Sequence, residues 1–159
     1  MFKINWKLLV ILLALLVAPA IAPSAMNSAI DLQAQAETYC KAYTVMREAG
    51  GESLKGKRAV LDVVENRMRL RNLSACQVMT QRGQFSFFTK NTEVRIPREA
   101  LTDYFRVAKM RRVLKKDVEY FHNVDVTPEW AGSMINVSNI GRHRFYADRQ
   151  ESFRLLASN

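Results

Sequence analysis

The sequence contains little cysteine, histidine, glycine or proline. Two cysteines in 159 residues are too few for a disulfide-dense miniprotein or for a four-cysteine zinc site. Two histidines provide few ligands for a catalytic metal site. Only six glycines and four prolines, together with 48% hydrophobic residues, exclude a disordered tail and a collagen-like rod. The length suits one compact domain, and no internal repeat divides it.

Acidic residues are also in the minority. Against 15 of them stand 24 lysines and arginines, so the formal net charge is +9. This excess favours an anionic partner, and composition alone leaves nucleic acid, a lipid surface and a cell-wall polymer open. Six basic residues crowd a predicted helix and form either a solvated face or a surface for an anionic envelope: Arg106, Lys109, Arg111, Arg112, Lys115 and Lys116.

A long hydrophobic run occurs at the N-terminus and has the pattern of a secretory signal. Two lysines precede the unbroken apolar stretch Leu8–Ala18, which is short for a membrane span but suits a signal core. Small residues that follow allow cleavage after Ala22 or Ala25. We therefore predict that residues 1–25 are a secretory signal peptide or, alternatively, an uncleaved anchor in the inner membrane. Residues 26–159 then form one exported domain in the periplasm or cell envelope.

Export affects how the net charge and the two cysteines are interpreted. Without the two signal lysines, 22 basic and 15 acidic residues remain, which gives a net charge of +7. Export also argues against nucleic acid as the anionic partner. In an oxidising compartment, Cys40 and Cys76 can pair in a disulfide that stabilises the fold by roughly 2–4 kcal/mol. Two independent buried thiols are the alternative, and the sequence does not decide between them.

Hydrophobic periodicity predicts an α+β domain that is mainly α-helical. Helices are expected over residues 31–48, ended by a Gly-Gly turn, over 53–70, and over 98–116 with Leu101, Tyr104, Phe105 and Ala108 turned inward. Ser74 and Gln77 form a capping-box pattern that opens a short helix. Residues 81–92 are expected to form an ordered loop. The short aromatic stretches 118–122 and 143–146 are candidate strands.

Two glutamates bracket the Gly-Gly turn and are the first candidates for chemistry. Glu48 ends the predicted helix and Glu52 follows the turn. A carboxylate in this place can be held by the helix and still face a cleft, as a general acid must. Apolar surroundings raise the pKa of such a group, so that it keeps its proton near neutral pH. Two solvated surface glutamates are the alternative interpretation.

Other candidates are polar and aromatic side chains that can bind a sugar: Gln84, Ser86, Tyr120, His122 and Trp130. Tyr120 and His122 share one face of an extended segment. Trp130 suits either a pyranose ring or a protein core. His143 lies between two arginines, where a structural role and a catalytic role both fit. A zinc site that joins the two histidines lacks the ligand spacing of known zinc motifs, so no metal and no cofactor are expected.

Six short motifs occur in a characteristic order, in the ranges Glu48–Glu52, Gly56–Arg67, Gly83–Ser86, Tyr120–His122, Pro128–Trp130 and Ile140–Tyr146. Together they resemble the SleB/CwlJ-type cell wall hydrolases, which include the spore cortex-lytic enzymes. The sequence departs from that family at Ser53, where a proline is common. Residues 91–116 also lack the usual glycine-rich insert and carry the basic helix instead.

The resemblance implies a lysozyme-like fold, mainly helical with a small β region, and cleavage of peptidoglycan glycan strands. By the same resemblance Glu48 is the catalytic acid, and Glu52 either orients the sugar or is structural. The expected partners are peptidoglycan and an anionic envelope surface, without nucleic acid, and a monomer is expected. The source is either a bacterial envelope enzyme or a phage lysis protein.

One well-placed acid leads to two reaction types at the bond between N-acetylmuramic acid and N-acetylglucosamine. A hydrolase needs a second carboxylate as nucleophile or base, whereas a lytic transglycosylase needs none. No second carboxylate stands out apart from Glu52, which favours the transglycosylase. Two other classes stay open at this point: a zinc-dependent peptidoglycan amidase or peptidase, and a non-catalytic envelope-binding domain.

Overall fold

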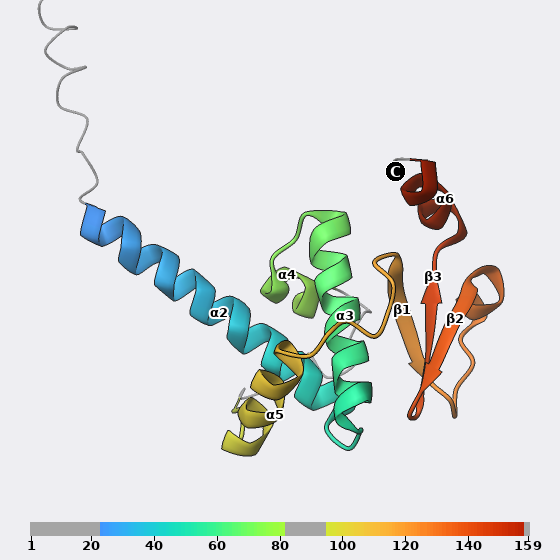
Figure 1. The fold of residues 1–159 in the computed structure, drawn as a ribbon, viewed down its shortest axis with the longest axis horizontal. Coiled ribbons are helices and arrows are strands. Elements are labelled where there is room, and N and C mark those ends of the chain that lie inside the picture. Colours follow the sequence, from blue (N-terminus) through green and yellow to red (C-terminus); the bar gives the residue numbers. More distant parts are fainter. Residues whose placement is uncertain (1–22, 82–94, 158–159) are drawn as a thin grey trace, which may run out of the picture. The chain divides into compact units, whose positions relative to one another are not determined.

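The computed structural model describes residues 23–81 and 95–157 (Figure 1). The chain divides into two units after Ala34, and of the first unit only the start of one helix is described. The second unit, residues 35–159, contains the core. No helix within the described ranges is long and apolar enough to cross a membrane. The predicted signal over residues 1–25 lies almost wholly outside these ranges and stays a prediction.

Helices precede a small sheet along the chain. In order, the elements are α2 (Pro23–Ala49), α3 (Leu54–Arg71), α4 (Ala75–Thr80), α5 (Arg98–Ala108), β1 (Val118–Asn123), the 3₁₀ helix η1 (Glu129–Ser133), β2 (Ile135–Ile140), β3 (His143–Ala147) and α6 (Arg149–Ala157). The central element is α3, which packs against α4, α5, β1 and β2 (Figure 1). The expected mainly helical domain with a small β region is confirmed.

Local sequence sets the helix boundaries. The turn at Gly50 and Gly51 follows the end of α2, as predicted. At the start of α3, the Ser53 hydroxyl accepts the backbone N–H of Gly56 at 3.3 Å. Ser74 and Gln77 form the predicted capping box before α4. These short-range hydrogen bonds satisfy helix-end groups that would otherwise lack partners.

The three strands form one antiparallel sheet in the order β1-β3-β2. The strands predicted over residues 118–122 and 143–146 correspond to β1 and β3. Neither β2 nor the C-terminal helix α6 was predicted from the sequence. Apolar and polar residues alternate only over the first four residues of β2, and Ile135 among them is exposed, so the strand pattern is short. The middle strand β3 brings Phe145 into the core, where its side chain is fully buried.

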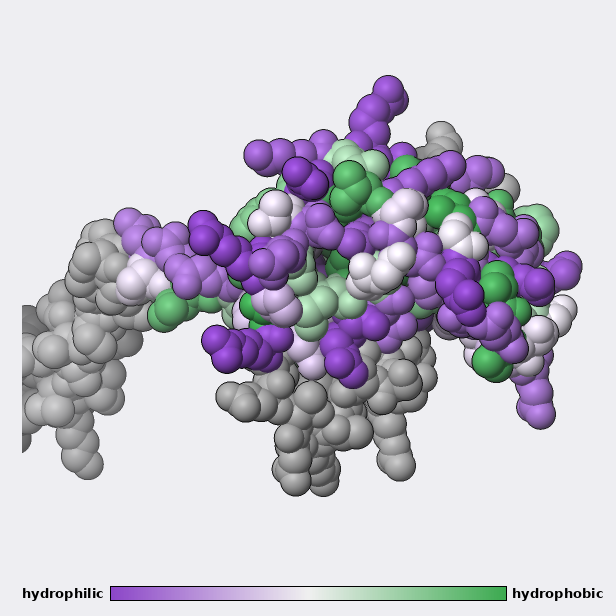
Figure 2. Space-filling view, turned by 90° about the horizontal axis from the view of Figure 1, so that it is seen from below, coloured by the Kyte–Doolittle hydropathy of each residue, from purple (hydrophilic) through white to green (hydrophobic). Residues whose placement is uncertain are grey.

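The hydrophobic core is built around α3. Each fully buried aliphatic side chain contributes roughly 1.5–3 kcal/mol to folding. Five apolar residues of α3 have no exposed surface: Ala59, Val60, Leu61, Val63 and Val64. Outside the core, hydrophobic residues are scattered among hydrophilic ones on the face shown in Figure 2.

The helix predicted over residues 98–116 is too long. In the structure α5 ends at Ala108, and residues 109–117 form an irregular segment. Ala108 and Phe105 are exposed rather than inward, and Val107 is fully buried in their place. Leu101 is half-buried and Tyr104 is buried, as expected.

A buried carboxylate on α3 explains this early helix end. The Asp62 side chain has no exposed surface and accepts the backbone N–H groups of Val113 and Leu114 at 2.8 and 2.9 Å. The exposed Arg112 pairs with Glu65 of α3 at 2.9 Å. Because these amide hydrogens bind Asp62, the segment follows the surface of α3 instead of continuing the helix.

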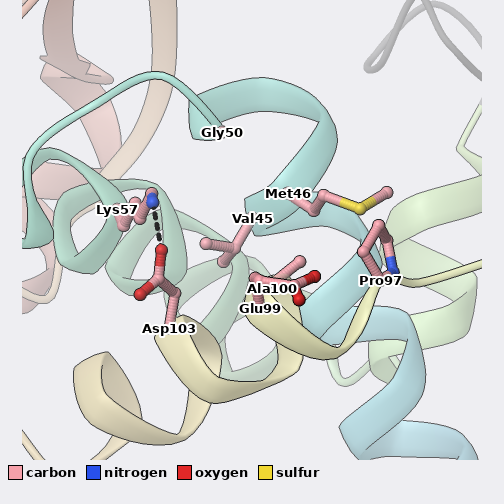
Figure 3. A pocket seen from close by; sticks show the side chains of 8 residues that line it. All are labelled: Val45, Met46, Gly50, Lys57, Pro97, Glu99, Ala100 and Asp103. Carbon is pink, nitrogen blue, oxygen red and sulfur yellow. Dashed lines mark hydrogen bonds and ion pairs between the residues drawn. The ribbon is translucent and has the colours of Figure 1, made fainter.

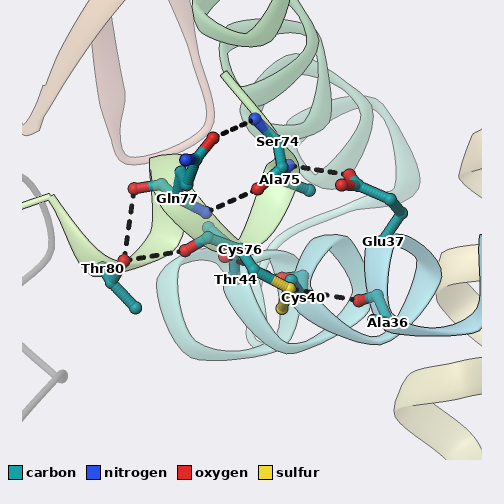
Figure 4. The surroundings of a disulfide bond; sticks show 9 residues. All are labelled: Ala36, Glu37, Cys40, Thr44, Ser74, Ala75, Cys76, Gln77 and Thr80. Atoms are coloured by element: carbon teal, nitrogen blue, oxygen red, sulfur yellow. Dashed lines mark hydrogen bonds between the residues drawn. A yellow bond between two sulfur atoms is a disulfide. The ribbon is translucent and has the colours of Figure 1, made fainter. Parts of the chain in front are cut away.

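The structure joins Cys40 of α2 to Cys76 of α4 in a disulfide (Figure 4). Their Cα atoms are 5.1 Å apart, and Cys40 is buried in the core. A neighbouring hydrogen bond runs from the backbone N–H of Ala75 to the Glu37 carboxylate at 2.7 Å. The start of α4 is therefore fixed to α2 by both a covalent and a polar contact.

Candidate active site

Glu48 is the next-to-last residue of α2, and its side chain is half-buried. Burial raises the pKa of its carboxyl group, and the positive charges of Arg67 and Arg47 reverse part of that shift. Within residues 23–81 and 95–157, no side chain or backbone group forms a hydrogen bond with the carboxylate. Within this described part of the chain, the group therefore combines a raised pKa with a carboxyl that has no hydrogen-bond partner, as a general acid requires.

Arg67 of α3 connects Glu48 electrostatically to the sheet. Its side chain is buried, and its Nε donates to the backbone carbonyl of Glu119 in β1 at 2.7 Å. The guanidinium carbon lies 5.7 Å from the centre of the Tyr120 ring. Burial lowers the pKa of Arg67 to about 10, so the group still carries its charge at neutral pH.

Four rings from two strands and η1 gather beside Arg67. Trp130 lies 5.8 Å from Tyr120, 5.7 Å from His122 and 5.6 Å from Tyr146, measured between ring centres. The structure therefore brings together three of the predicted sugar-binding residues, Tyr120, His122 and Trp130. Trp130 and Tyr120 remain half-buried, which leaves part of each ring open to a ligand. We refer to Tyr120, His122, Trp130 and Tyr146 as the aromatic cluster.

Both ring nitrogens of His122 are engaged within the protein. Nδ1 lies 2.8 Å from the backbone carbonyl of Asn123, and Nε2 lies 2.9 Å from the hydroxyl of Tyr146. A carbonyl can only accept, so Nδ1 carries the hydrogen and the neutral ring accepts the Tyr146 hydroxyl at Nε2. His122 therefore holds the aromatic cluster in place. Among the described residues, no three His, Cys, Asp or Glu side chains are grouped to hold a metal ion.

The side chain of Glu52, just before α3, contacts the turn between β2 and β3. Its carboxylate accepts the backbone N–H of Arg142 at 3.0 Å and lies 3.8 Å from Nδ1 of His143. Gly141 has a positive φ of 58°, and a Cβ there would stand only 1.8 Å from the Glu52 carboxylate. Gly56 packs against the same side chain from α3. Glu52 thus connects the start of α3 to the β-hairpin.

His143, the second histidine, is buried beside Phe121 with ring centres 5.1 Å apart. Burial lowers the pKa of His143, and the nearby Glu52 carboxylate reverses part of that shift. A neutral imidazole in an apolar contact fits the structural role considered for this residue from the sequence.

A comparison with protein-family models found a match to the cell wall hydrolases over residues 51–146. This range covers more than half of the chain. The chain belongs to the cell wall hydrolase family. The matched range includes Glu52 and the aromatic cluster, and it begins three residues after Glu48. Glu48 lies outside the matched range, so the match does not test its predicted role as catalytic acid.

Solved structures show the same fold as this hydrolase. The catalytic domain of the Bacillus cereus SleB protein has a TM-score of 0.55 and 21% identity, with 70% of this chain and 90% of that chain covered. The catalytic domain of the germination-specific lytic transglycosylase SleB from Bacillus anthracis has the same score and identity, with 69% and 93% covered. No curated protein sequence matched.

A cavity of this hydrolase opens on another side of α2 (Figure 3). It lies between the end of α2, the first turn of α3 and the start of α5. An ion pair between Lys57 and Asp103 closes one side of it. Glu48 does not line the cavity, because residues 45, 46 and 50 present a different face of the helix. The lining residues are Val45, Met46, Gly50, Lys57, Pro97, Glu99, Ala100 and Asp103.

Two predicted site residues, Gln84 and Ser86, lie outside the described residues. Two others were missed by the sequence analysis, namely Arg67 beside Glu48 and Tyr146 in the aromatic cluster. Both belong to the quoted motifs Gly56–Arg67 and Ile140–Tyr146, so motif membership was the available signal.

Proposed function

We propose that this cell wall hydrolase cleaves the glycan strand of peptidoglycan between N-acetylmuramic acid and N-acetylglucosamine, with Glu48 as the catalytic acid. The observation that carries the proposal is the half-buried Glu48 carboxyl group, whose pKa is raised by burial. A carboxylic acid that keeps its proton can protonate a glycosidic oxygen, which is the difficult step of this reaction.

The reaction then needs only this one acid. Glu48 donates its proton to the glycosidic oxygen, the bond from that oxygen to C1 of the muramic acid breaks, and positive charge develops at C1. The 6-hydroxyl of the same muramic acid attacks C1 and returns its proton to the Glu48 carboxylate. The product has a 1,6-anhydro end, and the acid is regenerated without water entering the reaction.

The environments of Glu52 and Glu119 favour this lytic transglycosylase over a hydrolase. Hydrolysis needs a second carboxylate roughly 5–9.5 Å from the acid. Glu52 is occupied by the backbone N–H of Arg142, and Glu119 is paired with Arg71 at 2.7 Å. The comparison structure from Bacillus anthracis is also described as a lytic transglycosylase.

Sugar binding is assigned to the aromatic cluster and to Gln84 and Ser86. The partly open rings of Tyr120 and Trp130 offer flat apolar surfaces for pyranose rings. Gln84 and Ser86 are proposed to add polar contacts. Glu52 acts on the site indirectly, by fixing the β-hairpin that carries Tyr146 in β3.

Digestion of purified peptidoglycan sacculi tests the proposal. We expect Glu48→Gln to abolish release of soluble fragments, because the amide cannot donate a proton to the leaving oxygen, while thermal unfolding shows an intact fold. Glu99→Gln is the matched control, since Glu99 is an exposed glutamate of α5. Fragment release by Glu48→Gln at the wild-type rate would refute the assignment. Mass spectrometry of the products separates 1,6-anhydro ends from the hydrated ends of a hydrolase.

We propose that the enzyme works outside the cytoplasm, in the periplasm or cell envelope. A cell wall substrate and the Cys40–Cys76 disulfide both support this location. N-terminal sequencing of protein isolated from cells tests the predicted signal. A new N-terminus after Ala22 or Ala25 shows cleavage, and an intact Met1 on membrane-bound protein shows retention as an anchor.

A further inference from the structure

The irregular segment after α5 has five exposed cations, of which Arg112 is ion-paired with α3. The other four are Lys109, Arg111, Lys115 and Lys116. We call these four residues the basic ridge. Between them, Met110 and Val113 are half-buried, and Leu114 is buried in the core. Because the apolar side chains of this segment turn inward, the segment presents mainly cations to solvent, namely the basic ridge and the ion-paired Arg112.

The backbone under the basic ridge is held firmly by α3. Asp62 accepts the N–H groups of Val113 and Leu114. Asn66 donates from its side-chain amide to the carbonyl of Lys115 at 2.9 Å, and Arg69 donates to the carbonyl of Lys116. Side chains on a fixed backbone lose less freedom when they bind a partner, so this anchoring prepares the surface for a ligand.

The charges of the basic ridge are not compensated within the described part of the chain. Two nearby carboxylates, Asp62 and Glu65, both pair with Arg58 and Arg112, at 2.7–3.6 Å. Asp117, next to Lys116, accepts the Ser152 hydroxyl at 3.0 Å, and its other oxygen is buried. No ion pair of the described residues includes a member of the basic ridge. A group of uncompensated cations on a fixed surface is complementary to a polyanion.

The basic ridge leads directly to the aromatic cluster. Lys116 precedes Tyr120 by four residues, so their Cα atoms are at most about 14 Å apart. The last turns of α3 contact both places, because Arg69 binds the carbonyl of Lys116 and Arg71 donates to the Tyr120 hydroxyl at 3.0 Å. A glycan strand on the aromatic cluster would therefore present its neighbouring muramic acids, and the peptides attached to them, to the basic ridge.

We propose that the basic ridge binds the carboxylates of the stem peptides on the same peptidoglycan strand that occupies the active site. The inference rests on the proposed function and adds a substrate feature to it, namely free carboxylates at positions flanking the cleaved bond. Exposed ion pairs are weak individually, so three or four of them act together to retain the enzyme on its insoluble substrate.

Co-sedimentation with intact sacculi tests this surface, with all variants in the non-cleaving Glu48→Gln background. The test variant replaces Arg111, Lys115 and Lys116 by glutamine. The control variant replaces Lys55, Arg95 and Arg98, which are also exposed, so both lose the same net charge. We expect the test variant to bind sacculi roughly tenfold more weakly and the control to change by less than about twofold. Added salt should reduce binding of the background protein more than that of the test variant.

Two further substrates identify the anionic group. Sacculi whose carboxylates are converted to neutral amides should bind the background protein and the test variant equally, whereas sacculi stripped only of phosphate-linked polymers should keep the tenfold difference. Equal loss in test and control variants overturns the proposal, as does a difference that disappears with the phosphate polymers or one seen only with anionic phospholipid vesicles. If wild-type protein binds sacculi through the basic ridge and releases no fragments, the proposed function fails and the binding surface stands.

Discussion

Replacing both cysteines should cost this enzyme a large part of its stability. The Cys40–Cys76 disulfide closes a loop with a sequence separation of 36 residues. The chain-entropy relation for such a loop gives about 4 kcal/mol of stabilisation at room temperature, because the cross-link restricts the unfolded chain. Native domains are stable by roughly 5–15 kcal/mol. We therefore expect the Cys40→Ala/Cys76→Ala variant to fold, but with a free energy of unfolding about 4 kcal/mol lower than that of the wild type.

Urea denaturation followed by circular dichroism measures this loss. The wild type with reductant should match the double variant in unfolding free energy, apart from the small packing loss at the buried Cys40. Reductant should leave the double variant unchanged, which is the control for effects of the reductant itself. A loss below about 1 kcal/mol in both comparisons would show that loop closure is not what this disulfide contributes, and that the unfolded chain is already restricted in this region.

Three further predictions concern Glu48 and the β-hairpin. Arg67→Gln removes the larger of the two cationic contributions that lower the Glu48 pKa, so the alkaline limb of the activity–pH profile should move to higher pH, and Arg67→Lys should move it less. Because the folded-state pKa of Glu48 is raised, ionisation weakens the fold as pH rises through it; Glu48→Gln should therefore unfold at higher denaturant than wild type at neutral pH, and not below about pH 4. Gly141→Ala should lower the free energy of unfolding by about 2–4 kcal/mol, because residue 141 has a positive φ and because the added Cβ would collide with the Glu52 carboxylate. In Gly132→Ala the added Cβ meets no neighbour, so stability should change little.

Each of these has a result that contradicts it. An unmoved alkaline limb in Arg67→Gln means that another group controls it. Equal stability of Glu48→Gln and wild type from acidic to neutral pH means that burial does not raise the Glu48 pKa. A Gly141→Ala variant as stable as Gly132→Ala means that the Glu52 side chain has room to move, and that its contact with the Arg142 backbone is dispensable.

Short-range patterns in the sequence predicted the helical part of the fold. The Gly-Gly turn after α2 and the capping box of Ser74 and Gln77 lie within a few residues of the helix ends that they set. The end of α5 depends on Asp62, whose carboxylate binds the N–H of Val113 from 51 residues away along the chain. No local pattern contains that information, so the prediction extended the helix to residue 116.

In the candidate site, too, short-range features were predictable from the sequence and long-range contacts were not. Tyr120 and His122 were placed on one face because strand residues two apart always share a face. Their contact with Trp130 was beyond the sequence, because it depends on how η1 folds back over the strand. Glu52 illustrates the limit most clearly, since its partner is the backbone of Arg142, 90 residues away, and a backbone N–H has no sequence signature.

The anchoring of the basic ridge through its backbone has a consequence for how this enzyme can diverge. Asp62 and Asn66 bind main-chain groups of the segment, and any amino acid can supply these groups except proline, which has no N–H to donate at positions 113 and 114. The outward side chains of Arg111, Lys115 and Lys116 are thus not needed to hold the segment on α3. These three residues can therefore be substituted, by evolution or by design, to suit cell walls of different chemistry without a change in the fold that carries the site.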